Sequence, residues 1–411
     1  MGGKGRPEYS LAYRMRERAK SGVDGQVLID YVPHGTQEKE IIDLWPTLRD
    51  YIGRLGNEDT QYHTSTVEDK ARYAVCCRHG NAAVIQDCKF VIVTANSAGS
   101  KVITQNFGKT AEFIVPIYDE AAMIGEADFW IAMVKLQEYQ KITGVWMTGD
   151  HNQLAKLVVS RGVRLDVFAA QIEYSIFTRL VTSGYTEVFE LLLCGRMHAE
   201  LLWFPNKRTY GGKLKATIVA NTRPLADSYR TWYKEYFKQE NDESCRLLSL
   251  MVDGTCDKVL KTGSKYNLKN AANIVHLVNS MREAKALPMK DIMILAMYSR
   301  QKTVISAMFA QMAQRLRLRR GGFPDVDTAD NFQASERTMV IRNTVDTDEL
   351  GFVDDENRMN MACTRARDVF YLVGSRMTMA LSKGDDDEAG RLAADKFTVQ
   401  RRRVTENNGV L

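Results

Sequence analysis

The prediction of the fold begins with Phe113 to Ala122, which reads Phe-Ile-Val-Pro-Ile-Tyr-Asp-Glu-Ala-Ala. Its apolar, strand-forming residues end in two adjacent carboxylates, Asp119 and Glu120. In open α/β sheets, ligands bind outside the carboxyl ends of the strands. There, one carboxylate can hold Mg²⁺ while a second polarises the water that attacks a phosphoryl group. An ordinary solvated strand end has the same pattern, so the interpretation depends on the rest of the chain.

A second apolar run, Thr143 to Leu154, also ends in polar residues. The helical pattern Phe129 to Tyr139 separates the two runs, so together they predict a βαβ unit. The carboxyl ends of its parallel strands share one edge of the sheet. We therefore expect Asp150 and Gln153, which follow the second run, to lie near the two carboxylates.

Composition restricts the class of protein without naming a function. The chain is 45% apolar and 26% charged, as in soluble globular proteins, and its 411 residues suffice for several domains. A net charge of +5 permits nucleic acid binding but does not argue for it. Seven cysteines, an odd number, favour reduced thiols. No apolar stretch is as long as the core of a signal peptide at the amino terminus or as a membrane helix elsewhere. We therefore expect an intracellular protein, in the cytoplasm or nucleus, without membrane association.

Two further stretches resemble phosphate-binding loops. Phe90 to Thr94 predicts a buried strand, and the small polar residues after it, Ala95 to Ser100, present either backbone amides to a phosphate or an ordinary turn. Gly108-Lys109-Thr110 has the last letters of the P-loop pattern G-x-x-x-x-G-K-[ST], but its leading glycine is replaced by Ile103. Too few residues separate it from Asp119 for a helix and a return crossover. We interpret it as a decoy, and the sequence contains no complete P-loop.

The second half of the chain predicts another α/β domain. Glu187 to Leu193 is a candidate strand that leads to Arg196, which is either a phosphate ligand or a surface arginine. Further predicted elements are helices at Asn270 to Met281, Thr303 to Arg320 and Asn360 to Arg367, and strands at Asp291 to Ala296, Met339 to Asn343 and Val369 to Val373.

Five short strings, in order, resemble the motifs of superfamily 1B helicases of the RNA-surveillance (nonsense-mediated decay) group. They are Asp119 to Ala122 (motif II), Gly149 to Leu154 (motif III), Arg196 to His198 with Phe204-Pro205 and Tyr210-Gly-Gly (motif IV), Asp330 to Glu336 (motif V) and Asn360 to Arg367 (motif VI).

The resemblance implies an α/β fold with two RecA-like domains of the P-loop NTPase type, mainly parallel sheets, and an incomplete first domain. The expected boundaries are a partial helical region at 1–88, the first RecA-like domain at 89–185, the second at 186–375 and a polar, flexible tail at 376–411. It also implies ATP and Mg²⁺ as cofactors and single-stranded RNA or DNA as the partner.

The resemblance assigns roles residue by residue. Asp119 would hold Mg²⁺, Glu120 would activate water, Gln153 would sense the γ-phosphate, and Arg196 and Arg365 would supply positive charge to the transferring phosphoryl group. Asp150, Glu336 and Arg367 would contact the nucleotide. The nucleic acid backbone would meet Thr94, Asn96, Gly99, Thr328 and Asn331.

The sequence also departs from the family. The P-loop, the adenine-recognition glutamine and the first strand-binding motif have no counterpart, and Gly195 stands where the family has a tyrosine. If three charge-assisted hydrogen bonds to phosphate are lost with the P-loop, at about 1.5–3 kcal/mol each, the binding free energy for ATP falls by roughly 5–9 kcal/mol. Micromolar affinity corresponds to about 8 kcal/mol, so a loss of this size would abolish it.

Three hypotheses therefore stand. The chain is the carboxyl-terminal portion of an ATP-dependent helicase, truncated and impaired as given. Alternatively, it is a non-hydrolysing remnant that binds nucleic acid or a protein. The third is a scaffold that does not bind nucleic acid.

Overall fold

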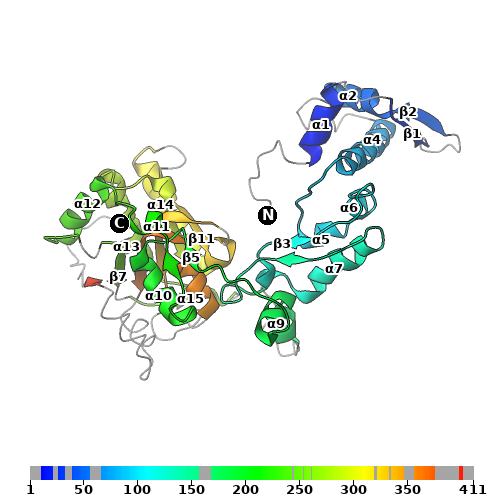
Figure 1. The fold of residues 1–411 in the computed structure, drawn as a ribbon. Helices are drawn as coiled ribbons and strands as arrows, with labels where there is room; N and C mark the ends of the chain where they lie inside the picture. The colour runs from blue at the N-terminus through cyan, green and yellow to red at the C-terminus, as the bar shows by residue number, and fades with distance from the viewer. Residues whose placement is uncertain are drawn as a thin grey trace. The chain divides into compact units, whose positions relative to one another are not determined.

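The computed structural model describes residues 11–21, 26–32, 39–55, 66–156, 168–242, 245–252, 254–260, 262–318, 322–332, 335–346, 356–374 and 398–400. They form two compact units, each described by itself (Figure 1). The first unit contains residues up to Asp150 and from Lys156 to Ser183. The second contains His151–Ala155 and the chain from Gly184 onward.

The amino-terminal part of the first unit is a small helical cluster with one hairpin. Its elements are α1 (Leu11–Ser21), β1 (Leu28–Tyr31), β2 (Glu40–Asp43), α2 (Leu44–Leu55) and α4 (Val67–Gln86). They pack around Trp45 and Leu48, and β1 pairs antiparallel with β2. The helical region expected at 1–88 therefore also contains a strand pair. Ile42 pairs with Ile29 and both are buried, and a β-branched pair of this kind favours strands.

The rest of the first unit contains the predicted βαβ unit. Strands β3 (Ile117–Tyr118) and β4 (Trp146–Met147) are parallel neighbours, and α7 (Glu126–Gln137) connects them. Tyr118 and Phe129 lie in the shared core. The short helices are α5 (Ala95–Ala98), α6 (Lys101–Thr104), the 3₁₀ turn η2 (Ala121–Met123), α8 (Ala169–Glu173) and α9 (Ile176–Ser183). The βαβ prediction is confirmed.

Two predictions for this unit need correction or lie outside the described chain. Phe90 to Thr94 is not a buried strand: no described strand pairs with it, and Ile92 is 83% exposed. An apolar run without a neighbouring ladder leaves its backbone groups to water, so its composition alone does not make it a strand. The decoy Gly108-Lys109-Thr110 lies in a turn that is followed by β3 and not by a helix. Within the first RecA-like domain expected at 89–185, residues 157–167 lie outside the described residues.

A six-stranded parallel sheet forms the centre of the second unit. Its strands, in spatial order, are β11 (Asp325–Thr328), β10 (Ile292–Ala296), β12 (Arg337–Asn343), β13 (Ala366–Gly374), β7 (Leu247–Met251) and β14 (Thr398–Gln400). The predicted strands β10, β12 and β13 are thus confirmed. Strand β14 comes from the stretch predicted as a tail, most of which lies outside the described residues.

Helices cover both faces of this sheet, as parallel sheets require. On β10, Ile292 and Ile294 face the core beneath α12 (Asp227–Phe237), α13 (Leu268–Glu283) and α14 (Ser299–Arg315). Met293 and Leu295 face the core beneath α10 (Ala199–Thr209) and α15 (Glu356–Cys363). This alternation confirms the predicted α/β class. Among the described residues, no helix is both long enough and apolar enough to cross a membrane.

Smaller elements surround the sheet. They are the parallel pair β5 (Leu193–Cys194) and β6 (Lys215–Ala216), the antiparallel pair β8 (Asp257–Lys258) and β9 (Lys265–Tyr266), α11 (Ile218–Asn221), η3 (Met289–Asp291) and η4 (Ala329–Phe332). The strand predicted from Glu187 is therefore reduced to its carboxyl end. Leu191, at 91% exposed, lacks the apolar cover that the prediction assumed.

The central sheet should dominate the stability of the second unit. Ile294 is fully buried in β10, so we expect Ile294→Ala to lower the free energy of unfolding by about 2–5 kcal/mol. Ile218→Ala, at an 83% exposed position, should change it by less than about 0.5 kcal/mol. Urea unfolding followed by fluorescence measures both. Equal effects of the two substitutions would contradict this assignment of the core.

Candidate functional site

The first unit holds Asp119 in a fixed position at the end of β3. Thr148 donates from Oγ1 to Oδ1 of Asp119 at 2.7 Å, and the Glu120 amide donates to the same oxygen at 3.1 Å. The Thr148 amide in turn donates to the Tyr118 carbonyl at 2.8 Å. Pairing of β3 with β4 therefore orients the carboxylate, which stays exposed to solvent.

Glu120 has an unusual backbone. Its φ of +51° lies in the left-handed region, which is uncommon for residues other than glycine and which clusters at functional sites. The next amide, of Ala121, donates to the Thr148 carbonyl at 2.8 Å. A Cβ on Gly149 would lie only 3.1 Å from that amide nitrogen, so this close approach favours glycine. Asp150 follows as the last residue before the chain enters the second unit.

These oxygen ligands fit Mg²⁺ better than a softer metal. Among the described residues, no three His, Cys, Asp or Glu side chains gather into a metal-binding group. Mg²⁺ usually takes one or two protein carboxylates, several waters and substrate phosphates. An exposed Asp119 beside Glu120 satisfies that requirement.

The loop predicted to touch nucleic acid is a short helical turn. Thr94 caps α5 through its hydroxyl, which accepts from the Ser97 amide at 3.4 Å. A Cβ on Gly99 would lie 2.7 Å from Cγ2 of Ile131, so glycine lets α5 approach α7. Thr94 and Gly99 thus have structural roles, while Asn96 is exposed and accessible.

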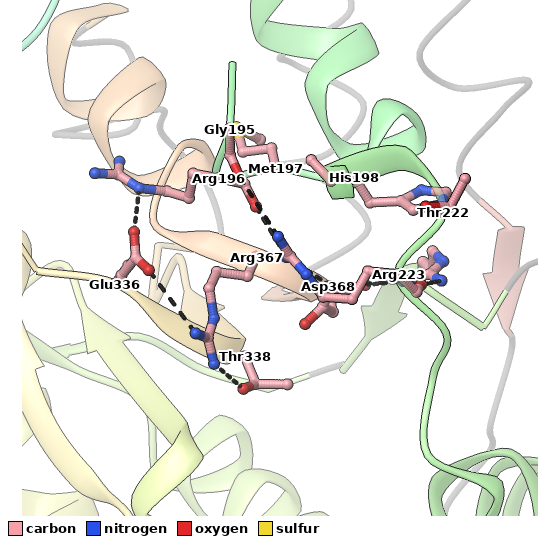
Figure 2. Close-up of polar contacts among 12 residues, drawn as sticks. Gly195, Arg196, Met197, His198, Thr222, Arg223, Glu336, Thr338, Arg367 and Asp368 are labelled. Carbon is pink, nitrogen blue, oxygen red and sulfur yellow. Dashed lines mark hydrogen bonds and ion pairs between the residues drawn. The ribbon is translucent and has the colours of Figure 1, made fainter. Parts of the chain in front are cut away.

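The second unit gathers arginines around one carboxylate, Glu336. Arg196 donates from Nε to Glu336 at 2.7 Å and from Nη1 to the Thr364 carbonyl at 3.0 Å. On the other side, Arg367 lies 3.9 Å from Glu336 and donates to Oγ1 of Thr338 at 2.7 Å. Figure 2 shows Glu336 between the two guanidinium groups. One carboxylate thus partly neutralises two positive charges.

The opposite face of β13 anchors the backbone of Arg196. Successive residues of a strand point to opposite faces, so Asp368 faces away from Arg367. Asp368 pairs with Arg223, whose Nη1 lies 3.0 Å from its Oδ1 (Figure 2). The same nitrogen donates to the Arg196 carbonyl at 3.0 Å, and Nη2 donates to the Gly195 carbonyl at 3.4 Å. Arg223 therefore ties the loop before α10 to the central sheet.

His198 completes this anchorage as a neutral helix cap. Its amide donates to the Arg367 carbonyl at 2.9 Å, and its Nδ1 accepts from the Glu200 amide at 3.3 Å. Burial, together with the nearby Arg246 guanidinium, lowers the pKa of His198. A neutral imidazole keeps Nδ1 available as an acceptor, as the cap requires.

The predicted helix Asn360 to Arg367 is too long and needs correction. Helix α15 ends at Cys363, Arg365 lies in the turn, and Arg367 is already in β13. Pairing with β12 begins at Ala366, and this ladder ends the helix. Arg365 is 2% exposed, and its Nη2 donates to Oε1 of Gln153.

Gln153 reaches Arg365 because the short segment 151–155 packs within the second unit. The Asn360 side chain donates to the Asn152 carbonyl at 2.9 Å, and Leu154 is buried against Met361. The structure thus brings motif III side chains together with motif VI. The expected proximity of Gln153 to Asp119 and Glu120 stays a prediction.

Thr328 and Asn331 lie at the carboxyl end of β11 and share one partner, Asp327. The Thr328 amide and the Asn331 side chain both donate to Oδ1 of Asp327, at 2.8 and 3.0 Å. Lys302 donates to it at 2.6 Å. Burial alone would raise the pKa of Asp327, but these hydrogen bonds outweigh it, so the pKa is lowered. The carboxylate stays ionised and organises this strand end.

Sequence reasoning missed several residues of the site. Thr148, Arg223, Thr338 and Asp368 carry contacts described above, yet none belongs to a recognisable short pattern. Once Arg367 and Asp368 are known to lie in a strand, the alternation of side chains predicts that they point to opposite faces of the sheet.

The sequence of this chain is similar to that of known proteins. A family model described as an AAA domain matches residues 172–377, half of the chain. The uncharacterized ATP-dependent helicase MJ0104 of Methanocaldococcus jannaschii is 25% identical over 301 residues, which are 73% of this chain and 41% of that protein.

Two eukaryotic proteins are similarly related. Regulator of nonsense transcripts 1 of Dictyostelium discoideum is 23% identical over 374 residues, 90% of this chain and 25% of that protein. The DNA replication ATP-dependent helicase/nuclease DNA2 of Bos taurus is 29% identical over 249 residues, 56% of this chain and 22% of that protein. The chain thus spans less than half the length of each relative. It belongs to the AAA domain family, and within it to the superfamily 1 helicases related to the regulators of nonsense transcripts.

Proposed function

We propose that this chain works in ATP-dependent unwinding of RNA or DNA, or in translocation along it. The observation that carries the proposal is the arginine cluster of the second unit. Arg196, Arg365 and Arg367 lie in or beside strand β13 and its neighbouring loop, with Glu336 as the carboxylate that two of them share. Such an excess of guanidinium charge fits the phosphates of ATP.

Arg196 and Arg365 are the residues proposed to stabilise the transferring phosphoryl group. An arginine that meets the developing charge of the transition state accelerates phosphoryl transfer by about 10³–10⁵ in GTPases. Both are pre-positioned, Arg196 by Glu336 and the Thr364 carbonyl, and Arg365 by burial against Gln153. Pre-positioned groups need no reorganisation during the reaction, so their effect falls on the rate. Arg367 is proposed to contact the nucleotide.

The first unit is proposed to bind the metal ion and to activate water. Asp119, held by Thr148, would bind Mg²⁺, and Glu120 would take the proton of the attacking water. Asp150 is proposed to contact the nucleotide and Gln153 to sense its γ-phosphate. Mg²⁺, when bound, supplies charge neutralisation at the phosphates.

Single-stranded RNA or DNA is the proposed partner. Asn96 in the first unit, and Thr328 and Asn331 in the second, offer small polar groups at loop ends, and Thr94 and Gly99 shape the first of these loops. Backbone contacts of this kind tolerate any sequence. With these proposed partners and ATP, the proposed location is inside the cell, in the cytoplasm or nucleus.

Glu120→Gln tests the proposal most simply. The amide cannot accept the proton of the attacking water, so we expect ATP turnover stimulated by single-stranded RNA or DNA to fall by at least about 100-fold. Glu112→Gln, which changes an exposed glutamate earlier in the same stretch, is the control and should retain turnover. A Glu120→Gln variant with normal turnover would refute the assignment.

Arg223 is proposed to position Arg196 without touching ATP. We expect Arg223→Ala to lower kcat while leaving KM for ATP within about twofold, because the loop that carries a transition-state contact loosens. Arg223→Lys keeps one charged donor toward Asp368 and should recover part of the rate. Steady-state ATP hydrolysis of the three proteins decides the point, and unchanged kcat in Arg223→Ala would remove Arg223 from the mechanism.

A second function is favoured by one specific observation, the lack of a P-loop pattern in these 411 residues. On that account the chain binds nucleic acid without hydrolysing ATP. Wild-type protein and Glu120→Gln would then retain single-stranded nucleic acid equally, and neither would release phosphate above background.

A further inference from the structure

Beside the predicted nucleic acid contacts of the second unit lies a small antiparallel hairpin, β8–β9. Its two strands pair Asp257 with Tyr266 and Lys258 with Lys265. A backbone bond of 3.0 Å from Val259 to the Ser264 carbonyl extends the ladder toward the turn. Leu260, the first residue of that turn, is fully exposed at 101%.

The base of the hairpin is fixed to the carboxyl ends of two central strands. Lys265 forms an ion pair of 2.5 Å with Asp346, which follows β12 and is 1% exposed. Tyr298, which follows β10, donates to the other oxygen of Asp346 at 2.8 Å. Ser264 accepts from the Arg300 amide at 3.1 Å. The hairpin is thus a projection from the ligand-binding edge of the sheet.

The turn after β12 adds backbone strain to this attachment. Val345 has a φ of +67°, which is a genuine outlier for a β-branched residue, and the Asp346 amide donates back to the Thr344 carbonyl at 2.8 Å. Such conformations persist only where the surroundings hold them. Here the next residue, Asp346, is held by Lys265 and Tyr298.

The surface around the hairpin carries an excess of positive charge. Lys258, Lys269 and Arg300 are exposed and form no ion pair with any residue that the structure describes. Asp257 is the one exposed carboxylate on the hairpin strands. The Asn267 amide and carbonyl both bond to the Gln301 side chain, at 2.8 and 3.1 Å, so the first turns of α13 and α14 lie side by side.

An aromatic ring, that of Tyr266, lies next to one of these positively charged side chains. Tyr266 is half-buried, and the guanidinium of Arg300 stacks over its ring at 5.8 Å from the centroid. A ring beside exposed cations is the arrangement by which proteins bind single-stranded nucleic acid without sequence preference, since every base has a π-face. If the contact between Arg300 and Tyr266 were only structural, the exposed lysines nearby, Lys258 and Lys269, would have no part in it.

The surface is continuous with the residues already proposed to meet nucleic acid. Arg300 and Lys302 belong to the first turn of α14, and Lys302 donates to Asp327, the shared partner of Thr328 and Asn331. Helix α14 therefore contacts both β11 and β9 and links the end of β11 to the hairpin.

We propose that the β8–β9 hairpin, with Lys258, Tyr266 and Arg300, binds single-stranded nucleic acid by stacking a base on Tyr266 and holding phosphates with the two cations. This inference rests on the proposed nucleic acid partner and adds the element that holds it. Leu260 at the tip is placed to contact a neighbouring base.

The experiment compares two probes by fluorescence anisotropy: a labelled oligothymidine and an abasic strand of the same length. Tyr266→Ala should weaken binding of oligothymidine by roughly 5- to 100-fold and leave binding of the abasic strand nearly unchanged. Tyr266→Phe keeps the ring and should bind both probes like wild type. Normal binding by Tyr266→Phe would also show that the protein folds with a substitution at this position.

Salt dependence isolates the phosphate contacts. Lys258→Glu should reduce the slope of log affinity against log salt by about 0.7, because the substitution removes one cation from the phosphate backbone. Lys290→Glu is the matched control: it makes the same charge change at an exposed site before β10, at the opposite edge of the sheet, and should leave the slope unchanged.

The outcomes separate this inference from the proposed function. Wild-type protein that binds, with Tyr266→Ala and Lys258→Glu indistinguishable from it, overturns the role of the hairpin and leaves the nucleic acid partner standing. Wild-type protein that binds neither probe overturns both. If polyglutamate competes as well as oligothymidine does, the hairpin binds acidic polypeptide and the inference is wrong.

Discussion

The second unit depends on the alternation of side chains along strand β13. Arg367 and Asp368 are adjacent, so one faces Glu336 and Thr338 while the other faces Arg223 and the buried side of the loop before α10. The strand is therefore held from both faces by charged contacts. Moving its register by one residue would exchange the arginine beside Glu336 for the carboxylate that pairs with Arg223. This constraint fixes the loop of Arg196 as well, because Arg223 bonds its backbone.

The two units differ in how completely their sheets are covered. The second has six parallel strands with helices on both faces. In the described part of the first unit, β3 and β4 form a two-stranded sheet, and Ile117 and Trp146 are 62% and 69% exposed. Parallel strands are normally buried on both faces, so this pair gains less from packing. Hydrogen bonds from Thr148 compensate locally, since they hold Asp119 without a large core around it.

Short stretches of sequence predicted the elements that depend on interactions between neighbouring residues. The strand ends that carry Asp119 and Asp150, the parallel pairing of β3 with β4, and the central strands β10, β12 and β13 follow from short apolar runs and their polar ends. Contacts between distant segments were beyond such reasoning: Arg223 meets Asp368 across 145 positions, and Arg365 meets Gln153 across 212. The exposed run Phe90 to Thr94 failed as a strand for the same reason, because a strand is defined by a partner that its own sequence does not specify.

The proposed function requires both Glu120 and Arg365 for the hydrolysis of ATP. A double-mutant cycle tests it through binding of ADP–aluminium fluoride with Mg²⁺, a mimic of the transferring phosphoryl group. Glu120→Gln and Arg365→Ala, alone and combined, are measured by calorimetry. If both residues meet the same analogue, their effects are coupled by about 0.5–3 kcal/mol. Effects that add to within about 0.3–0.5 kcal/mol, or wild-type protein that does not bind the analogue, would contradict the account.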